Sequence, residues 1–103
     1  MLTKVKDAAG RKILFLPHAL RQMLRPARFI TAREVHQVVE RGLIIEEYPN
    51  DPRGPSCLML GYGLDSRPIH IVCAPKDDFL AVITAYLPDA EEWSEDFRKR
   101  IKP

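Results

Sequence analysis

The spacing of apolar residues along the chain changes twice, and each change marks a change of predicted secondary structure. Residues 12–16 form a short apolar run suited to a strand, whereas in residues 17–41 apolar side chains recur every three or four positions, as on one side of a helix. From residue 43 they gather in short segments separated by turn residues, which predicts strands. The pattern therefore predicts a strand and two helices followed by a sheet, an α+β fold.

Two helices are expected before the sheet. The first should cover residues 17–25. Thr31 and Glu34 have the spacing of a capping box, in which each side chain satisfies a free backbone N–H of the first turn, so a second helix should start here. Gly42 is the expected left-handed cap at the end of this helix.

Four strands are expected after the second helix, and the connections between the last three are short enough for antiparallel hairpins. The natural arrangement is a four-stranded antiparallel meander. The predicted strands cover residues 43–48, 56–62, 68–74 and 79–86.

The two ends of the chain complete a single predicted domain over residues 1–103, a length suited to one modest core. Residues 1–10 contain no apolar run of the kind found in signal peptides, and we expect them to be flexible and the protein to be cytoplasmic. Residues 89–103 are charged, and Trp93 and Phe97 are four positions apart, which predicts a C-terminal helix docked by two aromatic side chains.

Alternation along the last two strands predicts which side chains share a face of the sheet. His70 should point away from the helices, because its apolar neighbours in the strand occupy the positions that face the core. Thr84 and Tyr86 should share a face with Leu80 and Val82 in the last strand. His70, Thr84 and Tyr86 are therefore expected on the face away from the helices.

Charge is distributed unevenly along the chain, although the total is only +2. Residues 1–41 have a net charge of +6, and residues 42–103 have a net charge of −4. A basic N-terminal part favours a polyanionic partner such as nucleic acid, but a solvated helical face would have the same composition.

Cysteine and histidine residues offer little support for a metal site or a cofactor. Cys57 and Cys73 lie in apolar strands, where free cysteines are usually small buried hydrophobes, and we expect no disulfide. His18, His36 and His70 are far apart in sequence, and no Cys or His pair has the close spacing of zinc ligands. We therefore predict neither a metal nor a cofactor.

Several motifs together resemble those of a known family. The chain has a His-Ala-Leu-Arg helix start at residues 18–21, a late strand containing His70, and a Thr-x-Tyr strand at residues 84–86. Over residues 15–88 it resembles a family of small, mostly uncharacterised bacterial domains that are distantly related to the RelE and BrnT toxins. The resemblance implies a RelE-like fold and a toxin role. It also implies a protein partner, because such proteins are often encoded beside a zinc-finger antitoxin of the YgiT or MqsA type.

A toxin of this kind would be a metal-independent endoribonuclease acting on mRNA, free or on the ribosome. Such cleavage needs a proton acceptor, a proton donor, and cations that stabilise the negative charge at phosphorus. The candidate catalytic residues are His18, Arg21, His70 and Tyr86. The candidate substrate-binding residues are Arg25, Arg28, Arg67 and Thr84.

Each candidate also has a plain structural interpretation. His18 would bond locally at a helix start, Arg21 would form a surface ion pair, and Thr84 would be an ordinary strand residue. The alternative function is therefore a protein-binding or RNA-binding module without catalysis.

Overall fold

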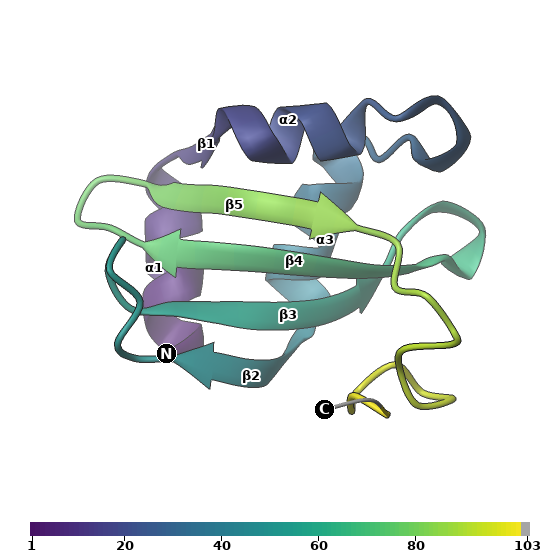
Figure 1. Ribbon diagram of the computed structural model, residues 1–103. Helices are drawn as coiled ribbons and strands as arrows, with labels where there is room; N and C mark the ends of the chain where they lie inside the picture. Colours follow the sequence, from purple (N-terminus) through teal and green to yellow (C-terminus); the bar gives the residue numbers. More distant parts are fainter. Residues whose placement is uncertain (102–103) are drawn as a thin grey trace.

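The computed structural model describes residues 1–101, which form three α-helices and a five-stranded sheet (Figure 1). The α+β class predicted from the sequence is confirmed. The α-helices are α1 (Leu2–Arg11), α2 (Pro17–Met23) and α3 (Ala32–Arg41), and single 3-10 turns occur at Pro26–Arg28 and Leu64–Ser66. The strands are β1 (Ile13–Phe15), β2 (Leu43–Tyr48), β3 (Ser56–Tyr62), β4 (Pro68–Pro75) and β5 (Leu80–Tyr86).

The sheet is mixed, with the strand order β1-β5-β4-β3-β2. Neighbouring strands from β2 to β5 run antiparallel, while β1 joins β5 in parallel. The prediction of a four-stranded sheet was therefore short by one strand. The strand at residues 12–16 was predicted, but its parallel pairing with β5 depends on contacts between residues far apart in the chain, such as the bond from Leu80 N–H to Lys12 O (2.8 Å).

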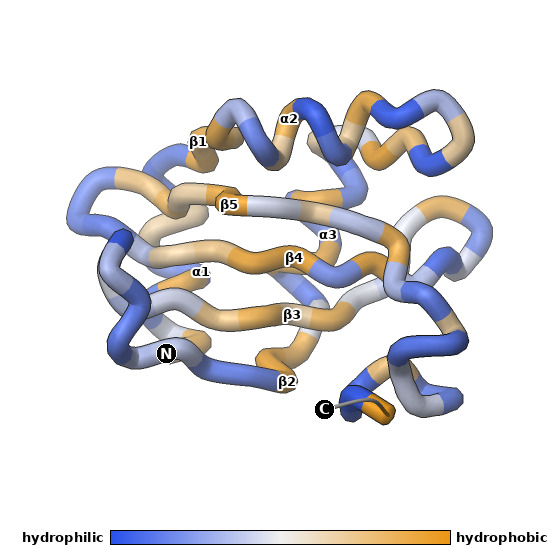
Figure 2. Tube along the Cα trace, viewed as in Figure 1, coloured by the Kyte–Doolittle hydropathy of each residue, from blue (hydrophilic) through white to orange (hydrophobic). Residues whose placement is uncertain are grey.

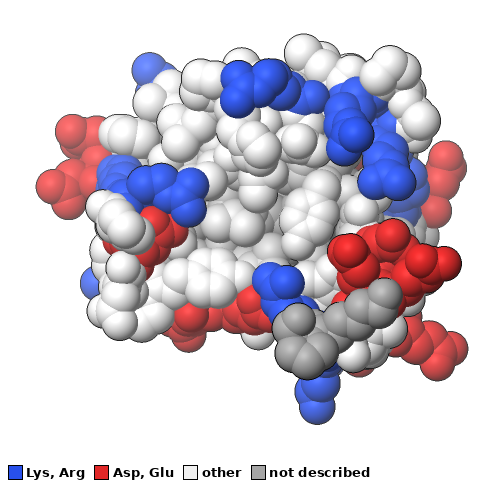
Figure 3. All heavy atoms as spheres, in the orientation of Figure 1, with Lys and Arg blue, Asp and Glu red and all other residues white. Residues whose placement is uncertain are grey.

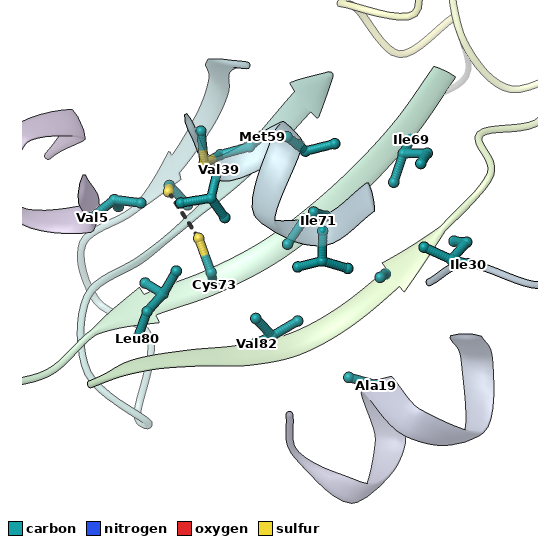
Figure 4. Close-up of a cluster of buried hydrophobic side chains, with 14 of the residues drawn as sticks. Val5, Ala19, Ile30, Val39, Met59, Ile69, Ile71, Cys73, Leu80 and Val82 are labelled. Atoms are coloured by element: carbon teal, nitrogen blue, oxygen red, sulfur yellow. Dashed lines mark hydrogen bonds between the residues drawn. The ribbon is translucent and has the colours of Figure 1, made fainter. Parts of the chain in front are cut away.

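Helices α1 and α3 cover one face of the sheet, and α2 lies along the β1–β5 edge (Figure 1). We call the covered side the helix face and the opposite side the open face. Figure 2 shows hydrophobic stretches of the trace along β3 and β4, the central strands of the sheet. Figure 4 shows this core, in which side chains from α1 and α3 interlock with those of the strands. Its fully buried members include Val5, Val35, Met59, Ile69, Ile71 and Val82.

The N-terminal residues are helical rather than flexible. In α1 the only buried side chains are Val5 and Ala8, which lie on one side of the helix and pack into the core. The sequence prediction was wrong because two small apolar residues among charged ones form too weak a pattern to mark a helix. Burial against β4 and β5, which the sequence does not reveal, stabilises α1.

The predicted C-terminal helix is absent from residues 89–101, and residues 102–103 lie outside the described part of the chain. Residues 92–101 form a small hairpin, in which Ser94 N–H bonds Lys99 O (2.7 Å) and Ile101 N–H bonds Glu92 O (3.0 Å). The Ser94 hydroxyl accepts from Lys99 N–H (3.1 Å) and so competes with helical bonding. Phe97 has a φ of 61°, which no right-handed helix allows. We call residues 92–101 the C-terminal hairpin.

A bulge in β5 changes which side chains face the helices. Val72 pairs with Thr84, but the next residue, Cys73, pairs with Val82, so Ile83 is the extra residue. The predicted grouping of Leu80 and Val82 with Thr84 and Tyr86 was wrong, because the bulge shifts the alternation so that Leu80 and Val82 face the helices while Ala81 and Ile83 face the open side. Tyr86 pairs with His70, and Thr84 pairs with Val72, so His70, Thr84 and Tyr86 do share the open face.

The boundaries of α3 follow the prediction, but the reason for a glycine at its end differs from the one predicted. The capping box is present: Glu34 N–H bonds the Thr31 hydroxyl (3.1 Å), and Thr31 N–H bonds the Glu34 carboxylate (3.1 Å). Gly42 is not left-handed, since its φ is −77°. Glycine is required there because a Cβ would collide with the carbonyl oxygens of Val38 and Leu60.

None of the helices in residues 1–101 combines the length and the apolar character needed to cross a membrane.

Candidate functional site

His70 is a polar side chain of the open face that has no exposed surface. Its Nε2 lies 2.9 Å from the backbone oxygen of Phe97, and its Nδ1 lies 3.1 Å from the Tyr86 hydroxyl. A carbonyl oxygen can only accept, so Nε2 carries a hydrogen and donates it. In the neutral ring Nδ1 then accepts, and the Tyr86 hydroxyl is its donor.

The environment keeps both members of this pair neutral at pH 7. Burial lowers the pKa of His70, and the Phe97 carbonyl and the negative charge of Glu46 only partly oppose that effect. Burial also raises the pKa of Tyr86, so the phenol keeps its proton. The pair is therefore a neutral phenol that donates to a neutral imidazole.

The C-terminal hairpin covers His70. The Trp93 ring meets the imidazole edge-on, with ring centroids 4.4 Å apart, and is itself 4% exposed. The Arg100 guanidinium lies 4.7 Å from the Trp93 ring centroid and donates two hydrogen bonds to Glu46 (3.0 and 3.2 Å). Aromatic and ionic contacts together close this end of the open face.

Glu46 connects the hairpin to the edge strand β2. It faces Leu58, whereas Glu47 faces Cys57 on the other side of the sheet, so the two carboxylates do not form a pair. Tyr48 donates its hydroxyl to Glu46, and burial together with this bond raises the pKa of Tyr48 to about 12. Burial raises the pKa of Glu46, but the bonds from Arg100 and Tyr48 outweigh this and hold the pKa below its ordinary value.

Glu46 and Arg100 were not among the predicted site residues. Alternation along β2 does not place Glu46, because a bulge between Ile44 and Glu46 shifts the register. Arg100 was predicted to lie in a helix, and nothing in the sequence links it to β2. Trp93 had been predicted to be buried, and it is buried, although in a hairpin rather than in a helix.

A cavity of about 290 Å³ opens beside this cluster, at the carboxyl end of β5. It brings together three of the predicted residues: Arg25 and Arg28 from the turn that follows α2, and Tyr86 from the end of β5. Both arginines are exposed, and Tyr86 is half-buried. The residues lining the cavity are Gln22, Arg25, Arg28, Tyr86, Leu87, Asp89 and Glu92.

His18 and Arg21 are exposed on α2 and are not brought to His70. The residue before α2, Leu16, bonds Val82 O through its N–H, whereas His70 pairs with Tyr86, four positions further along β5. The start of α2 therefore lies nearer the start of β5, and within residues 1–101 no hydrogen bond or ring contact joins His18 to His70.

Arg67 belongs to a structural ion pair. Its Nη2 donates to both carboxylate oxygens of Glu34 (2.9 and 3.0 Å) and to Phe29 O (2.8 Å). Burial raises the pKa of Glu34, but the bond to Arg67 and the N–H groups of Thr31 and Leu64 more than offset this, so the pKa lies below its ordinary value. These contacts join α3 to the β3–β4 connection and account for the position of Arg67. A contact between Arg67 and an RNA phosphate stays a prediction.

The surface charges separate along the right-hand side of the open face (Figure 3). Basic side chains gather over α2 and the turn that follows it, acidic ones over the segment after β5, and the middle of the sheet is uncharged. The basic group includes Arg21, Arg25 and Arg28, and the acidic group includes Asp89, Glu91, Glu92, Glu95 and Asp96.

The cysteines and potential metal ligands of residues 1–101 form no obvious reactive centre. Cys57 and Cys73 are buried free thiols on paired strands, with their sulfurs 3.9 Å apart (Figure 4). In the same part of the chain, no three His, Cys, Asp or Glu side chains are grouped so as to hold a metal ion.

A model of one protein family matches residues 15–87, which is most of the chain. The chain belongs to the DUF4258 family. Members are described as a domain of unknown function. The matched part of this DUF4258 protein contains His18, His70 and Tyr86, while α1 and the C-terminal hairpin lie outside it. No curated protein and no solved structure matches the chain significantly.

Proposed function

We propose that this DUF4258 protein acts on RNA as a metal-independent endoribonuclease, in the manner of RelE-like toxins. The observation that carries the proposal is the cavity in which two exposed guanidinium groups, Arg25 and Arg28, meet the Tyr86 phenol backed by His70. Guanidinium groups suit phosphate oxygens, and a phenol bonded to an imidazole can pass a proton.

In the proposed reaction the phosphodiester lies between Arg25 and Arg28, which stabilise the negative charge that builds up at phosphorus. The 2′-hydroxyl gives its proton to the Tyr86 oxygen as the Tyr86 proton moves to Nδ1 of His70. The 2′-oxygen then attacks phosphorus, and the 5′-oxygen leaves and takes a proton from water. The imidazolium formed in the first step is stabilised by the Phe97 carbonyl and the negative charge of Glu46, and it returns its proton through Tyr86 to the hydroxide left by that water, which restores both groups.

His70 therefore acts behind Tyr86 in this scheme, since its ring has no exposed surface. His18 and Arg21, which lie on α2 before the two cavity arginines, would contact the flanking part of the RNA strand rather than the scissile bond. Thr84 lies two positions before Tyr86 on the same face and would border the bound strand.

The resemblance to RelE and BrnT toxins supports the wider role. We propose that the protein is the toxin of a type II toxin–antitoxin pair, acting on mRNA in the cytoplasm, free or on the ribosome. Its neutralising partner would be a zinc-finger antitoxin of the YgiT or MqsA type.

Binding without cleavage is the second candidate, and the state of His70 favours it. Both ring nitrogens are occupied, and burial lowers the pKa of the ring, which makes the imidazole a weak base. A module of this kind would hold RNA through the same arginines and leave the strand intact.

The purified protein, incubated with single-stranded RNA in the presence of EDTA, separates the two candidates. For an endoribonuclease, Tyr86→Phe should reduce cleavage about 10²- to 10⁴-fold with little loss of binding. The double variant Arg25→Ala/Arg28→Ala should weaken both binding and cleavage. Arg33→Ala/Arg41→Ala, which removes two exposed arginines of α3 that do not line the cavity, is the matched control.

If the RNA stays intact and its binding depends on Arg25 and Arg28, the endoribonuclease proposal fails and the binding module is supported. If wild type neither binds nor cuts RNA, and its induction does not slow bacterial growth, both candidates fail.

A further inference from the structure

Acidic side chains of the protein itself line part of the proposed RNA site. Asp89 and Glu92 line the same cavity as Arg25 and Arg28 (Figure 3 shows the facing charges). Carboxylates and phosphates both offer anionic oxygen acceptors to guanidinium groups. The segment after β5 therefore places anionic oxygens, like those of an RNA phosphate, beside the arginines proposed to bind RNA.

These opposite charges are close but not locked together. Within residues 1–101, no ion pair within 4.0 Å joins Arg25 or Arg28 to Asp89 or Glu92. The hydrogen bond found for the Arg25 guanidinium goes to Gln22 instead (3.4 Å). An RNA phosphate entering the cavity would thus have no direct salt bridge to break.

The position of the acids is set by contacts on either side of them. Pro88, directly before Asp89, is buried, and Trp93, directly after Glu92, packs on His70. The Phe97 carbonyl and Arg100 attach the rest of the hairpin to His70 and Glu46. These contacts with His70 and Glu46 tie a segment outside the family-matched residues 15–87 to groups inside that range.

We propose that residues 89–101 are a built-in acidic competitor that lowers the affinity of the Arg25–Arg28 cavity for RNA. The inference rests on the proposed function and adds its regulation. Because the two carboxylates are tethered beside the arginines, they are present at every binding event whatever the protein concentration, and they weaken the attraction between the arginines and a phosphate. A partner that pulls the hairpin away would increase RNA binding.

The test is RNA affinity after neutralisation of the cavity acids, measured by anisotropy with a short labelled single-stranded RNA at low salt. Asp89→Asn/Glu92→Gln removes two charges, and the amide oxygen introduced by Asp89→Asn can still accept the bond that Asp89 takes from Glu91 N–H (2.8 Å). The control Glu91→Gln/Glu95→Gln removes two charges from the same segment at exposed positions that do not line the cavity. Trp93 emission reports whether the hairpin stays docked.

We expect the cavity variant to bind RNA about tenfold more tightly than wild type, with unchanged Trp93 emission, and the control to gain less than about twofold. Equal gains in the two variants, or no gain in either while wild type binds RNA, would overturn the competitor but leave the proposed function standing. Absence of RNA binding in wild type and in both variants would overturn the two proposals together.

Discussion

The two faces of the sheet share the same strands but are held by different kinds of contact. On the helix face, aliphatic side chains from α1 and α3 interlock with the strands over a continuous core. The open face has a smaller apolar cluster of Ala74, Ala81 and Ile83 at one end, and its other end is closed by a single imidazole, a tryptophan ring and an ion pair. Apolar packing is spread over many residues and is cooperative, whereas the cover of His70 depends on a few groups whose protonation and charge matter.

The helix face therefore supplies most of the stability of the domain. The open face is partly covered by the C-terminal hairpin, a segment that can detach without unfolding the core. Segments that move for function are drawn from the less stable regions of a protein. The C-terminal hairpin fits this description, because among residues 92–101 only Trp93 is buried.

The largest effect is expected from a substitution on the helix face. Ile71→Ala removes a side chain with no exposed surface from the centre of the core and should lower the free energy of unfolding by about 2–5 kcal/mol. Urea denaturation followed by circular dichroism measures it. A loss below about 1 kcal/mol would show that the helix face is not the main source of stability.

Trp93→Ala is the matching substitution on the open face, and we expect a smaller global loss of about 1–3 kcal/mol. Replacing a tryptophan in a rigid core by alanine typically lowers the free energy of unfolding by more than this, because a cavity remains. Here the hairpin can move away, so no cavity has to remain. Hydrogen exchange should show faster exchange at the Ser94 and Ile101 amides with little change in β3 and β4. Exchange that rises equally throughout the sheet would mean that the two faces unfold as one.

Thr31→Ala removes the capping hydroxyl of α3 and should cost about 1 kcal/mol, measured by urea denaturation. The effect should be confined to the helix face, so the emission of Trp93 in the folded protein should match that of wild type. A shifted emission maximum would reveal coupling between the faces that the contacts do not show.

The smallest effect on global stability is expected from mild acid. The pKa of His70 in the folded protein lies below its ordinary value of 6.5, so between these two values the unfolded chain binds a proton that the folded chain does not. Stability and hairpin docking should therefore fall as the pH drops below 6.5, and should be fully present above it. Loss of the Glu46 bonds follows only at lower pH, below the ordinary carboxyl value of 4.5.

The loss of hairpin docking on protonation of His70 can be followed in wild type by Trp93 emission between about pH 7.5 and about pH 5. His70→Gln, which can still donate to the Phe97 carbonyl and accept from Tyr86, should lack it. His36→Gln changes an exposed histidine of α3 and should keep it. The same transition in all three proteins would assign it to a group other than His70.

The candidate site was only partly foreseeable. Alternation placed His70 and Tyr86 on one face correctly, because their half of each strand lies on one side of the bulge. The same rule failed for Leu80 and Val82, since a bulge depends on pairing with β4 and leaves no periodic mark in the sequence. Arg67 has the chemistry of a phosphate ligand, and only the folded chain shows that Glu34 occupies its guanidinium group.

What the sequence determined by itself was local: the turn chemistry, the capping box of Thr31 and Glu34, and the periodicities that mark α2, α3 and β2 to β5. These depend on neighbouring residues, so they are visible in one dimension. Tertiary structure alone decided the helix at residues 2–11, the parallel place of β1, and the hairpin that puts Trp93 on His70. Each depends on burial against residues far away in the chain, and that burial outweighs weak or opposite local preferences.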